Sequence, residues 1–423
     1  MGRLLVDATD LETWSGTHGG VQRVVYAVTK QLFLLDRPVS FIAFDAAENR
    51  FYITDFQVIY DRVERVRQAK QEVAPGVVRK TIAERLYERA KRYRLLRAAA
   101  RPAKAILKKG QDELPPSKDW VEFEKDDTVL VLGMAWENLN IQRVLGEQRA
   151  QVGFRLAQLV YDLIICLYPH LHHPSNYAPY TAHMKGVVAD SDLLLAISES
   201  TKRDVLTFAK REHIKPPLVE VVRLGDELLK EKRELKKPAI EGLGKEFILC
   251  VGTVEVRKNH TLLYYAYKLA ASRGVTLPQL VIVGGSGWYS GDVQYLMTTD
   301  PEMQEKIKIV HGLEDDGLAW LYEHCQFTVY PSMYEGWGLP IAESLAYGKL
   351  CLASSTSSMT EIAGKMIDYF SPFDARECME KIAKYAGDEV LLNKAEAKIK
   401  SSYETTPWST TAAQVYEMVK ARK

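Results

Sequence analysis

The sequence predicts an α/β protein built of two domains, and two observations support this fold class. First, 423 residues exceed the length that one hydrophobic core usually covers, so two domains of roughly 200 residues each are expected. Second, short apolar runs that favour β-strands are followed by a turn containing glycine and then by an apolar pattern with helical spacing, as after Arg3 to Asp7 and after Phe327 to Tyr330. This alternation of strands and helices is typical of α/β domains.

The composition narrows the class of protein further. With 47% hydrophobic and 26% charged residues the chain is typical of soluble globular proteins, and a net charge of +1 argues against a nucleic-acid partner. No apolar run approaches the roughly 20 residues that cross a bilayer, and the opening MGRLLVDATD enters a strand without a signal-peptide pattern. The cysteines lack metal spacing, so we expect reduced core thiols in a cytoplasmic protein. They are Cys166, Cys250, Cys325, Cys351 and Cys378.

The stretch Glu335 to Gly348 connects a predicted strand to a predicted helix. Pro331 ends the strand, since proline cannot donate to a sheet, and Pro340 fits the first turn of the helix. Between them the glycines allow the backbone to approach a ligand, and the amide groups at a helix N-terminus favour an anion such as phosphate. The expected phosphate-binding residues are Gly336, Trp337, Gly338 and Leu339.

Two carboxylates, Glu335 and Glu343, lie eight positions apart on either side of this turn. An acid beside a phosphate site makes sense when a hydroxylated group lies between them, as in a sugar nucleotide with its hexose at one carboxylate and its ribose at the other. The alternative is a solvated glutamate at a helix start, where the helix dipole favours it.

The same stretch closely resembles the E-x7-E signature of the retaining glycosyltransferase family 4, and the resemblance runs with gaps over most of the chain. It implies the GT-B fold, in which two Rossmann-like domains with parallel sheets face each other across a cleft. It also implies that Glu335 contacts hydroxyls of the donor sugar and that Glu343 holds the nucleotide ribose. The following SSTSSMTEIAG resembles the Ser-rich turn and Glu of the family, which we expect to brace the donor loop.

Two cations, Arg257 and Lys258, stand at a predicted helix start with Asn259 or Thr261 as the cap. Cations at a helix N-terminus oppose the dipole and make sense only opposite an anion. The resemblance implies that Lys258 neutralises the donor diphosphate. Thr253 occupies the usual position of the family arginine, and Arg257 is expected to replace it.

Three further strands of the second half end at residues that the resemblance places around the nucleotide. They are Gly252, Gly285, and His311 with Gly312. The sequence GGSGWYSG after the second of these strands matches the G-x-G-x-x-G pattern of nicotinamide sites poorly, because its third glycine is misplaced. An NAD-dependent oxidoreductase is therefore the less favoured alternative.

In the first half, Gly19 and Gly20 precede a helix, and the resemblance implies a glycine-rich loop close to where acceptor and donor phosphate meet. Phe154 to Ile165 predicts a strand that carries Asp162 to the cleft, and we expect this aspartate nearest the acceptor. Family members often have His-Asp here, whereas this chain has Tyr161 before the aspartate.

We considered two clusters as metal sites. His170, His172 and His173 lack a second ligand pair at matched spacing, so we expect loop histidines near the acceptor instead. Asp190 and Asp192 form a D-x-D that precedes a strand, and we expect them to cap and solvate its start. No metal or other cofactor is predicted.

A basic segment from Arg62 to Lys109 interrupts the first half. Within it, Thr81 to Lys109 predicts an amphipathic helix with apolar and basic faces. Such a helix could lie on an anionic membrane surface, or it could be a solvated insertion.

These patterns predict a first domain over 1–225, a linker over 226–244, a donor-binding domain over 245–406 and a terminal helix over 407–423 that packs back on the first domain.

The predicted activity is retaining transfer of a hexose from a nucleotide-diphosphate sugar to a lipid-linked or oligosaccharide acceptor in bacterial surface polysaccharide synthesis (O-antigen, capsule or exopolysaccharide). The loop GTVEVRKN most resembles transferases of bacterial surface polysaccharide assembly, several of which use GDP-mannose, so this resemblance makes mannose the first choice of donor. The enzyme would act in the cytoplasm or on the inner face of the membrane, and its expected catalytic residues are Glu335, Asp162, Lys258 and Arg257. The remaining alternative is a protein that binds sugar nucleotides without transfer.

Overall fold

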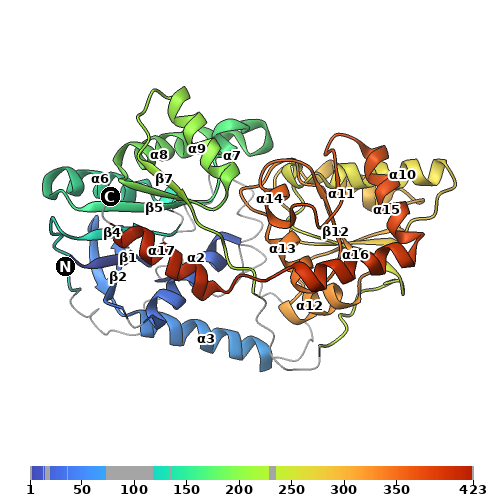
Figure 1. The fold of residues 1–423 in the computed structure, drawn as a ribbon, viewed down its shortest axis with the longest axis horizontal. Helices are drawn as coiled ribbons and strands as arrows, with labels where there is room; N and C mark the ends of the chain where they lie inside the picture. The colour runs from blue at the N-terminus through green and yellow to red at the C-terminus, as the bar shows by residue number, and fades with distance from the viewer. Residues whose placement is uncertain are drawn as a thin grey trace, which may run out of the picture.

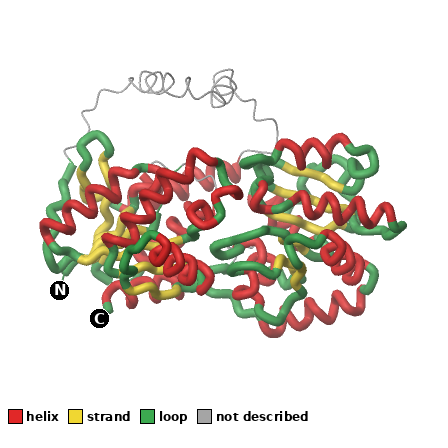
Figure 2. Tube along the Cα trace, turned by 90° about the horizontal axis from the view of Figure 1, so that it is seen from above, coloured by secondary structure: helices red, strands yellow, loops and turns green. Residues whose placement is uncertain are grey.

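The computed structural model describes residues 2–12, 14, 20–35, 37–72, 118–133, 135–227 and 235–421, without the side chains of 66–72 and 137. Gly19 and the predicted helix from Thr81 to Lys109 lie outside the described residues. The chain forms two α/β lobes side by side, and in each lobe helices flank a central sheet (Figures 1 and 2).

The first lobe contains a seven-stranded sheet in the order β3-β2-β1-β4-β5-β6-β7, in which only β2 and β3 are antiparallel. Leu4 and Val6 of β1 pack with helix α2 on one face, while Leu5 packs with helix α6 on the other. Burial on both faces explains why these strands are apolar throughout. The strands are β1 Leu4–Asp7, β2 Val39–Asp45, β3 Arg50–Thr54, β4 Thr128–Val131, β5 Arg155–Val160, β6 Leu193–Ala196 and β7 Leu218–Val221.

Two predicted strands of this lobe are too long. The sequence of residues 39–60 predicts the two strands of a hairpin, but the second strand ends at Thr54, because the Asp55 side chain accepts from the backbone N–H of Gln57 and starts helix α3. The strand expected to reach Ile165 ends at Val160, and the apolar residues that follow form a short helix. The helices are α1 Thr9–Glu12, α2 Gly20–Leu34, α3 Phe56–Glu72, η1 Ala135–Glu137, α6 Leu139–Val152, α7 Ile164–Leu167, η2 Pro169–Leu171, η3 Pro174–Asn176, α8 Tyr177–Asp190 and α9 Glu199–Arg211.

The second lobe contains a six-stranded, fully parallel sheet in the order β10-β9-β8-β11-β12-β13. Its strands are β8 Phe247–Val251, β9 Gln279–Val283, β10 Ile307–Val310, β11 Thr328–Tyr330, β12 Cys351–Ser354 and β13 Tyr369–Phe370. Its helices are η4 Val256–Lys258, α10 His260–Ser272, α11 Gly291–Thr299, α12 Asp315–His324, α13 Leu339–Ala346, α14 Met359–Ala363, α15 Ala375–Ala386 and α16 Glu389–Ser402.

All five cysteines are buried and unpaired, which confirms the prediction of core thiols. Among the described helices, none is both long and apolar enough to cross a bilayer.

The last helix, α17 Trp408–Lys420, leaves the second lobe and packs against α2 of the first (Figure 1). Trp408 lies against Gly225 so closely that an added Cβ there would be 2.5 Å from the indole. At the other end, Arg155 donates to the carbonyl of Val419 at 2.8 Å. The chain passes between the lobes twice, near Asp226 and near Thr406. These two segments contact each other, since the backbone N–H of Asp226 donates to the Thr406 carbonyl at 3.0 Å.

Trp408→Ala should destabilise the first lobe, because it removes a buried indole from the contact that holds α17. Such truncations cost about 3–5 kcal/mol of unfolding free energy. Urea unfolding followed by circular dichroism measures this loss. Val390→Ala on α16 is the control, since that side chain is 79% exposed and its loss should change stability by less than about 0.5 kcal/mol. A similarly small effect for Trp408→Ala would show that α17 contributes little to the first lobe.

Candidate active site

The turn between β11 and α13 lies where the two lobes touch. Gly338 adopts φ +137°, a conformation that side chains rarely allow, and an added Cβ would also be 3.0 Å from Ile362. Gly336 is required for a different reason, because a Cβ there would be 2.1 Å from the carbonyl oxygen of Tyr161 in the first lobe. One glycine therefore shapes the turn, and the other admits the opposite lobe.

Glu335 is buried in this turn with two cations around it. Its Oε1 accepts from Lys258 Nζ at 2.6 Å, and its Oε2 lies 2.5 Å from Arg257 Nη1. Burial alone would raise the pKa of Glu335, but the charges of Arg257 and Lys258 outweigh this effect and hold it at about 2. Glu335 is therefore ionised at neutral pH, and we call these three side chains the charged cluster.

Tyr330 completes this cluster and was not predicted. Its hydroxyl donates to Glu335 Oε1 at 2.9 Å and accepts from Lys258 Nζ at 2.6 Å. The sequence contained one signal for it, because Tyr330 is the last residue of β11, and polar groups at the carboxyl ends of parallel strands line ligand sites.

Arg257 and Lys258 lie in η4, directly before α10. Arg257 also donates to the Tyr334 carbonyl at 3.0 Å and pairs with Glu255 at 2.8 Å, which fixes the plane of its guanidinium. Asn259 stands at the helix start as predicted, but its side chain does not cap the helix. It adopts φ +57° and donates instead to the carbonyls of Pro331 and Pro372, so it ties the loop after β8 to the turn after β11.

Glu343, expected to hold a ribose, is engaged by both lobes. Its Oε1 accepts from Arg23 of α2 at 2.5 Å, and its Oε2 accepts from the Tyr322 hydroxyl at 2.9 Å. Gly20 is the first residue of α2, and the position of its missing Cβ faces open space, so no close approach requires a glycine there. Sequence reasoning missed Arg23, although a cation one turn beyond a glycine pair was visible.

Asp162 follows β5 and lies against the turn. A Cβ added to Gly336 would be 3.0 Å from the Cβ of Asp162. Burial raises the pKa of Asp162, and the nearby charge of Arg257 offsets only part of this rise. Tyr161 does not face the cleft, since its hydroxyl donates to the Leu132 carbonyl at 2.7 Å inside the first lobe. The residue that stands in place of the family histidine is therefore a buried structural tyrosine.

The predicted serine turn contacts the Glu335 turn directly. Ser357 accepts from the backbone N–H of Glu335 at 2.9 Å, and Ser358 donates to the carbonyls of Glu335 and Trp337. Glu361, in contrast, reaches the other lobe, where it accepts from the N–H groups of Glu199 and Ser200 at the start of α9, both at 2.8 Å.

A second contact between the lobes that the sequence did not reveal joins Tyr334 to Asp204 at 2.9 Å. Burial raises the pKa of Asp204 to about 6, although the hydrogen bond from Tyr334 opposes this rise.

The clusters weighed as metal sites have other contacts. Asp190 accepts from Gln142 at 3.1 Å, and Asp192 pairs with Arg149 at 2.5 Å, both away from the cleft. His172 and His173 lie beside the ring of Trp288 from the second lobe. Within the described ranges, no group of three His, Cys, Asp or Glu side chains is arranged to hold a metal.

The remaining predicted residues lie at the ends of β8, β9 and β10. Gly252 packs on the Lys258 side chain, and an added Cβ on Gly284 would be 2.0 Å from the Gly252 carbonyl oxygen. Gly285 directly follows, and its Cβ position is open. A Cβ on Gly287 would be 2.7 Å from Thr253. Close packing between two loops thus explains the first and third glycines of GGSGWYSG without a dinucleotide.

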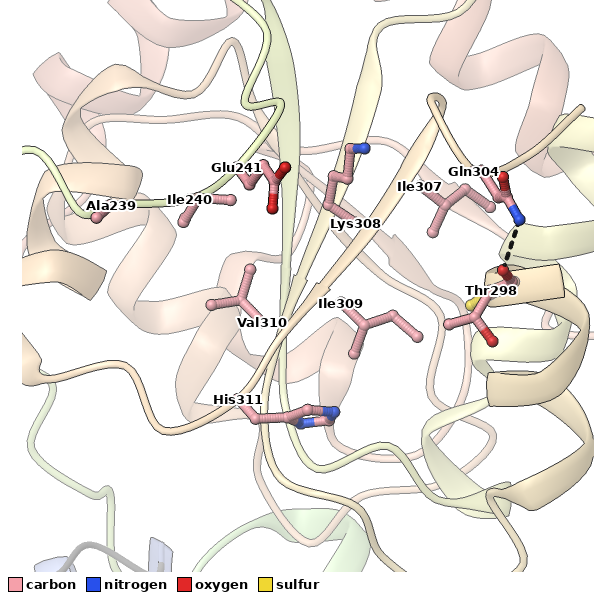
Figure 3. A pocket seen from close by; sticks show the side chains of 11 residues that line it. Ala239, Ile240, Glu241, Thr298, Gln304, Ile307, Lys308, Ile309, Val310 and His311 are labelled. Carbon is pink, nitrogen blue, oxygen red and sulfur yellow. Dashed lines mark hydrogen bonds between the residues drawn. The ribbon is translucent and has the colours of Figure 1, made fainter. Parts of the chain in front are cut away.

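His311 follows β10, and its Nδ1 lies 2.6 Å from the Gly284 carbonyl oxygen. Gly312 adopts φ +67° directly after it. His311 also forms one end of a hollow of about 440 Å³ along β10, opposite the segment 239–241 (Figure 3). This hollow lies at the outer edge of the second sheet rather than at the charged cluster, because β10 is the edge strand.

Two facing Rossmann-like lobes place the chain in the GT-B fold class. Residues 231–404 match the family described as "Glycosyl transferases group 1". This match to the second lobe supports the predicted assignment to glycosyltransferase family 4, whose members are retaining hexosyltransferases. The predicted fold is confirmed, and the match agrees with the predicted family.

Curated relatives and solved structures agree with this assignment. The "Serotype-specific mannosyltransferase WbdA" of Escherichia coli is 26% identical over 228 residues, which are 52% of this chain and 28% of that protein. The "O-antigen chain mannosyltransferase B" of the same species is 24% identical over 271 residues, 63% of this chain and 70% of that protein. The chain thus spans little more than a quarter of WbdA.

Among solved structures, HepE of Anabaena in complex with UDP and glucose aligns over 100% of both chains, with a TM-score of 0.60 and 14% identity. At this identity the likeness concerns the fold.

Glu335→Gln should lower the stability of the protein in a way that depends on pH. The folded pKa of about 2 lies below the unfolded value of about 4.3, so the stabilisation is complete above about pH 5 and is lost as pH falls toward 2. The variant should be less stable than the parent by about 3 kcal/mol at pH 7, and this difference should shrink toward pH 3. Thermal unfolding at several pH values tests this, with Glu380→Gln on the exposed face of α15 as the control. A difference that stays constant with pH would contradict the ion cluster.

Proposed function

We propose that this protein transfers a hexose, with mannose as the first choice, from a nucleotide-diphosphate sugar to a saccharide acceptor with retention of configuration. The observation that carries the proposal is the charged cluster of Glu335, Arg257 and Lys258 beside the N-terminus of α13.

The cluster suits a leaving diphosphate. The helix dipole favours negative charge at the N-terminus of α13, although Pro340 has no N–H group and Ile341 donates to the Gly338 carbonyl at 2.9 Å. Arg257 and Lys258 add two cations whose positions are fixed by Glu255, Tyr330 and the Tyr334 carbonyl. Fixed cations in a buried site stabilise developing negative charge without reorganisation, which is the task a metal ion performs in other transferases.

We assign Glu335 to binding of the donor sugar. Its carboxylate lies between the two cations, and when a diphosphate takes part of their charge, the freed oxygens are placed to accept from sugar hydroxyls. Glu343 is the corresponding group for the ribose. Arg23 and Tyr322 hold it now, so the ribose hydroxyls would enter this same network.

Asp162 is assigned to the acceptor. It contacts the turn at Gly336 from the first lobe, and its raised pKa makes it a better proton acceptor once ionised. As a carboxylate it is also the nucleophile that a double displacement would use. The family expectation favours departure and attack on the same face of the sugar instead, with a phosphate oxygen as base.

The choice of mannose and of a bacterial surface polysaccharide, on a lipid-linked or oligosaccharide acceptor, rests on relatives that are named as O-antigen mannosyltransferases. A protein that binds sugar nucleotides without transfer is the second candidate, and turnover separates the two.

Glu335→Gln should reduce release of nucleoside diphosphate from the donor by about 10–100-fold, because a charged hydrogen bond to the sugar becomes a neutral one, a loss of about 1.5–3 kcal/mol. Affinity for the free nucleoside diphosphate should change less than about threefold. Coupled detection of nucleoside diphosphate and calorimetric titration provide the two measurements, and Glu380→Gln is again the control. Turnover equal to that of the parent would contradict the role of Glu335, and loss of turnover on adding EDTA would contradict the metal-free mechanism.

Among nucleotide sugars, GDP-mannose should raise the melting temperature most in a thermal-shift panel that includes UDP- and dTDP-sugars. Lys258→Ala should abolish this rise, because the diphosphate loses a fixed cation. A clear preference for a UDP- or dTDP-sugar would overturn the choice of mannose while leaving the transferase assignment intact.

A further inference from the structure

Four rings from the two lobes meet at the cleft, and we call them the aromatic platform: Trp288, Tyr289, His172 and His173. His173 lies 5.2 Å from Trp288 and stacks on Tyr289 at 6.1 Å with an interplanar angle of 7°, while His172 lies 5.7 Å from Trp288. The indole is nevertheless 43% exposed and the phenol 57% exposed. Large rings that are fixed in place and still open to solvent are typical of ligand-binding surfaces.

The platform adjoins the charged cluster. The Trp288 carbonyl accepts from the backbone N–H of Val256 at 3.1 Å, and Arg257 is the next residue. On the first-lobe side, the ring centroid of Tyr168 lies 4.6 Å from that of Tyr334. Tyr334 is the residue directly before Glu335. The loop with His172 and His173 and the loop with Trp288 therefore flank the charged cluster on the side of Asp162.

The loop that carries Trp288 and Tyr289 packs closely against the loop after β8. Gly287 lets it pack against Thr253 and Glu255, where a Cβ would meet side-chain atoms at 2.7 and 3.0 Å. Tyr289 adopts φ +52°, a conformation that costs energy for a tyrosine. The loop therefore presents Tyr289 at the surface with a strained backbone.

We propose that the aromatic platform is a subsite for one sugar ring of the acceptor. This ring is the neighbour of the acceptor sugar whose hydroxyl receives the hexose. This inference rests on the proposed function. The face of a pyranose that carries C–H groups packs on an indole or phenol, and the imidazole nitrogens can hydrogen-bond its hydroxyls.

Its chemistry fits a neutral sugar better than the donor phosphates. None of the four rings carries a fixed charge, whereas Arg257 and Lys258 supply the cations that a diphosphate needs. The nucleotide side of the site, at Glu343, is built from other elements of both lobes. An acceptor of at least two sugars would therefore bind more tightly than a single sugar.

The test compares methyl α-mannoside with α-linked mannobiose and mannotriose, titrated by calorimetry into the full chain in the presence of GDP. We expect the parent to bind the longer saccharides at least fivefold more tightly than the monosaccharide. Trp288→Ala should remove this difference, and Tyr289→Ala should reduce it. Tyr295→Ala is the matched control, since that ring is 67% exposed on the neighbouring α11.

Three outcomes overturn the inference: a parent that shows no preference or no binding, a Trp288→Ala variant that keeps the preference, and a Trp288→Ala variant that loses more than fivefold in affinity for GDP. The last outcome would assign the platform to the donor. Failure of the proposed function is seen separately, as a parent that binds no nucleotide sugar in the thermal-shift panel.

Discussion

The burial of Glu335 between two cations is the interaction on which the site depends. Removing a carboxylate from water costs several kcal/mol, and such a group stays ionised only when opposite charges and hydrogen bonds compensate it. Arg257, Lys258 and Tyr330 supply this compensation. These residues come from the ends of β8 and β11, so the ion cluster also fixes the relative positions of two loops, and Asn259 reinforces it by bonding to both Pro331 and Pro372.

The contacts between the lobes surround the same cluster. Gly336 touches Tyr161, Arg23 reaches Glu343, and Glu361 bonds to the start of α9. Each joins a residue of the predicted donor site, or of the turn that braces it, to the first lobe. Some groups proposed to bind the donor thus also join the lobes, and a ligand that competes for Arg23 would change both binding and the contact between the lobes.

Much of the fold could be predicted because strands buried on both faces leave an apolar signature, as in β8 and β9, and glycine turns mark their ends. Strand ends were less predictable, since Asp55 and Leu163 start helices within apolar or β-favouring sequence. Glu335 was predicted as a site residue because it stands beside a glycine turn, and Arg257 and Lys258 because cations at a helix start oppose the dipole. The structure brings these three side chains together. Tyr330, Arg23 and Trp288 were missed because each has a partner far away in sequence, which is Lys258, Glu343 and the pair His172 and His173, respectively. Tyr161 shows the same limit, since neither its place beside Asp162 nor its type indicated that its hydroxyl points into the core.

The path of the last helix has a consequence for how the protein forms in the cell. All strands of the second sheet lie between β8 and β13, whereas the surface of α2 stays uncovered until α17 has been made. On the ribosome, the lobe synthesised first is therefore completed last, and its apolar surface near Gly225 and Val28 must wait exposed, or be sheltered by a chaperone, until Trp408 emerges.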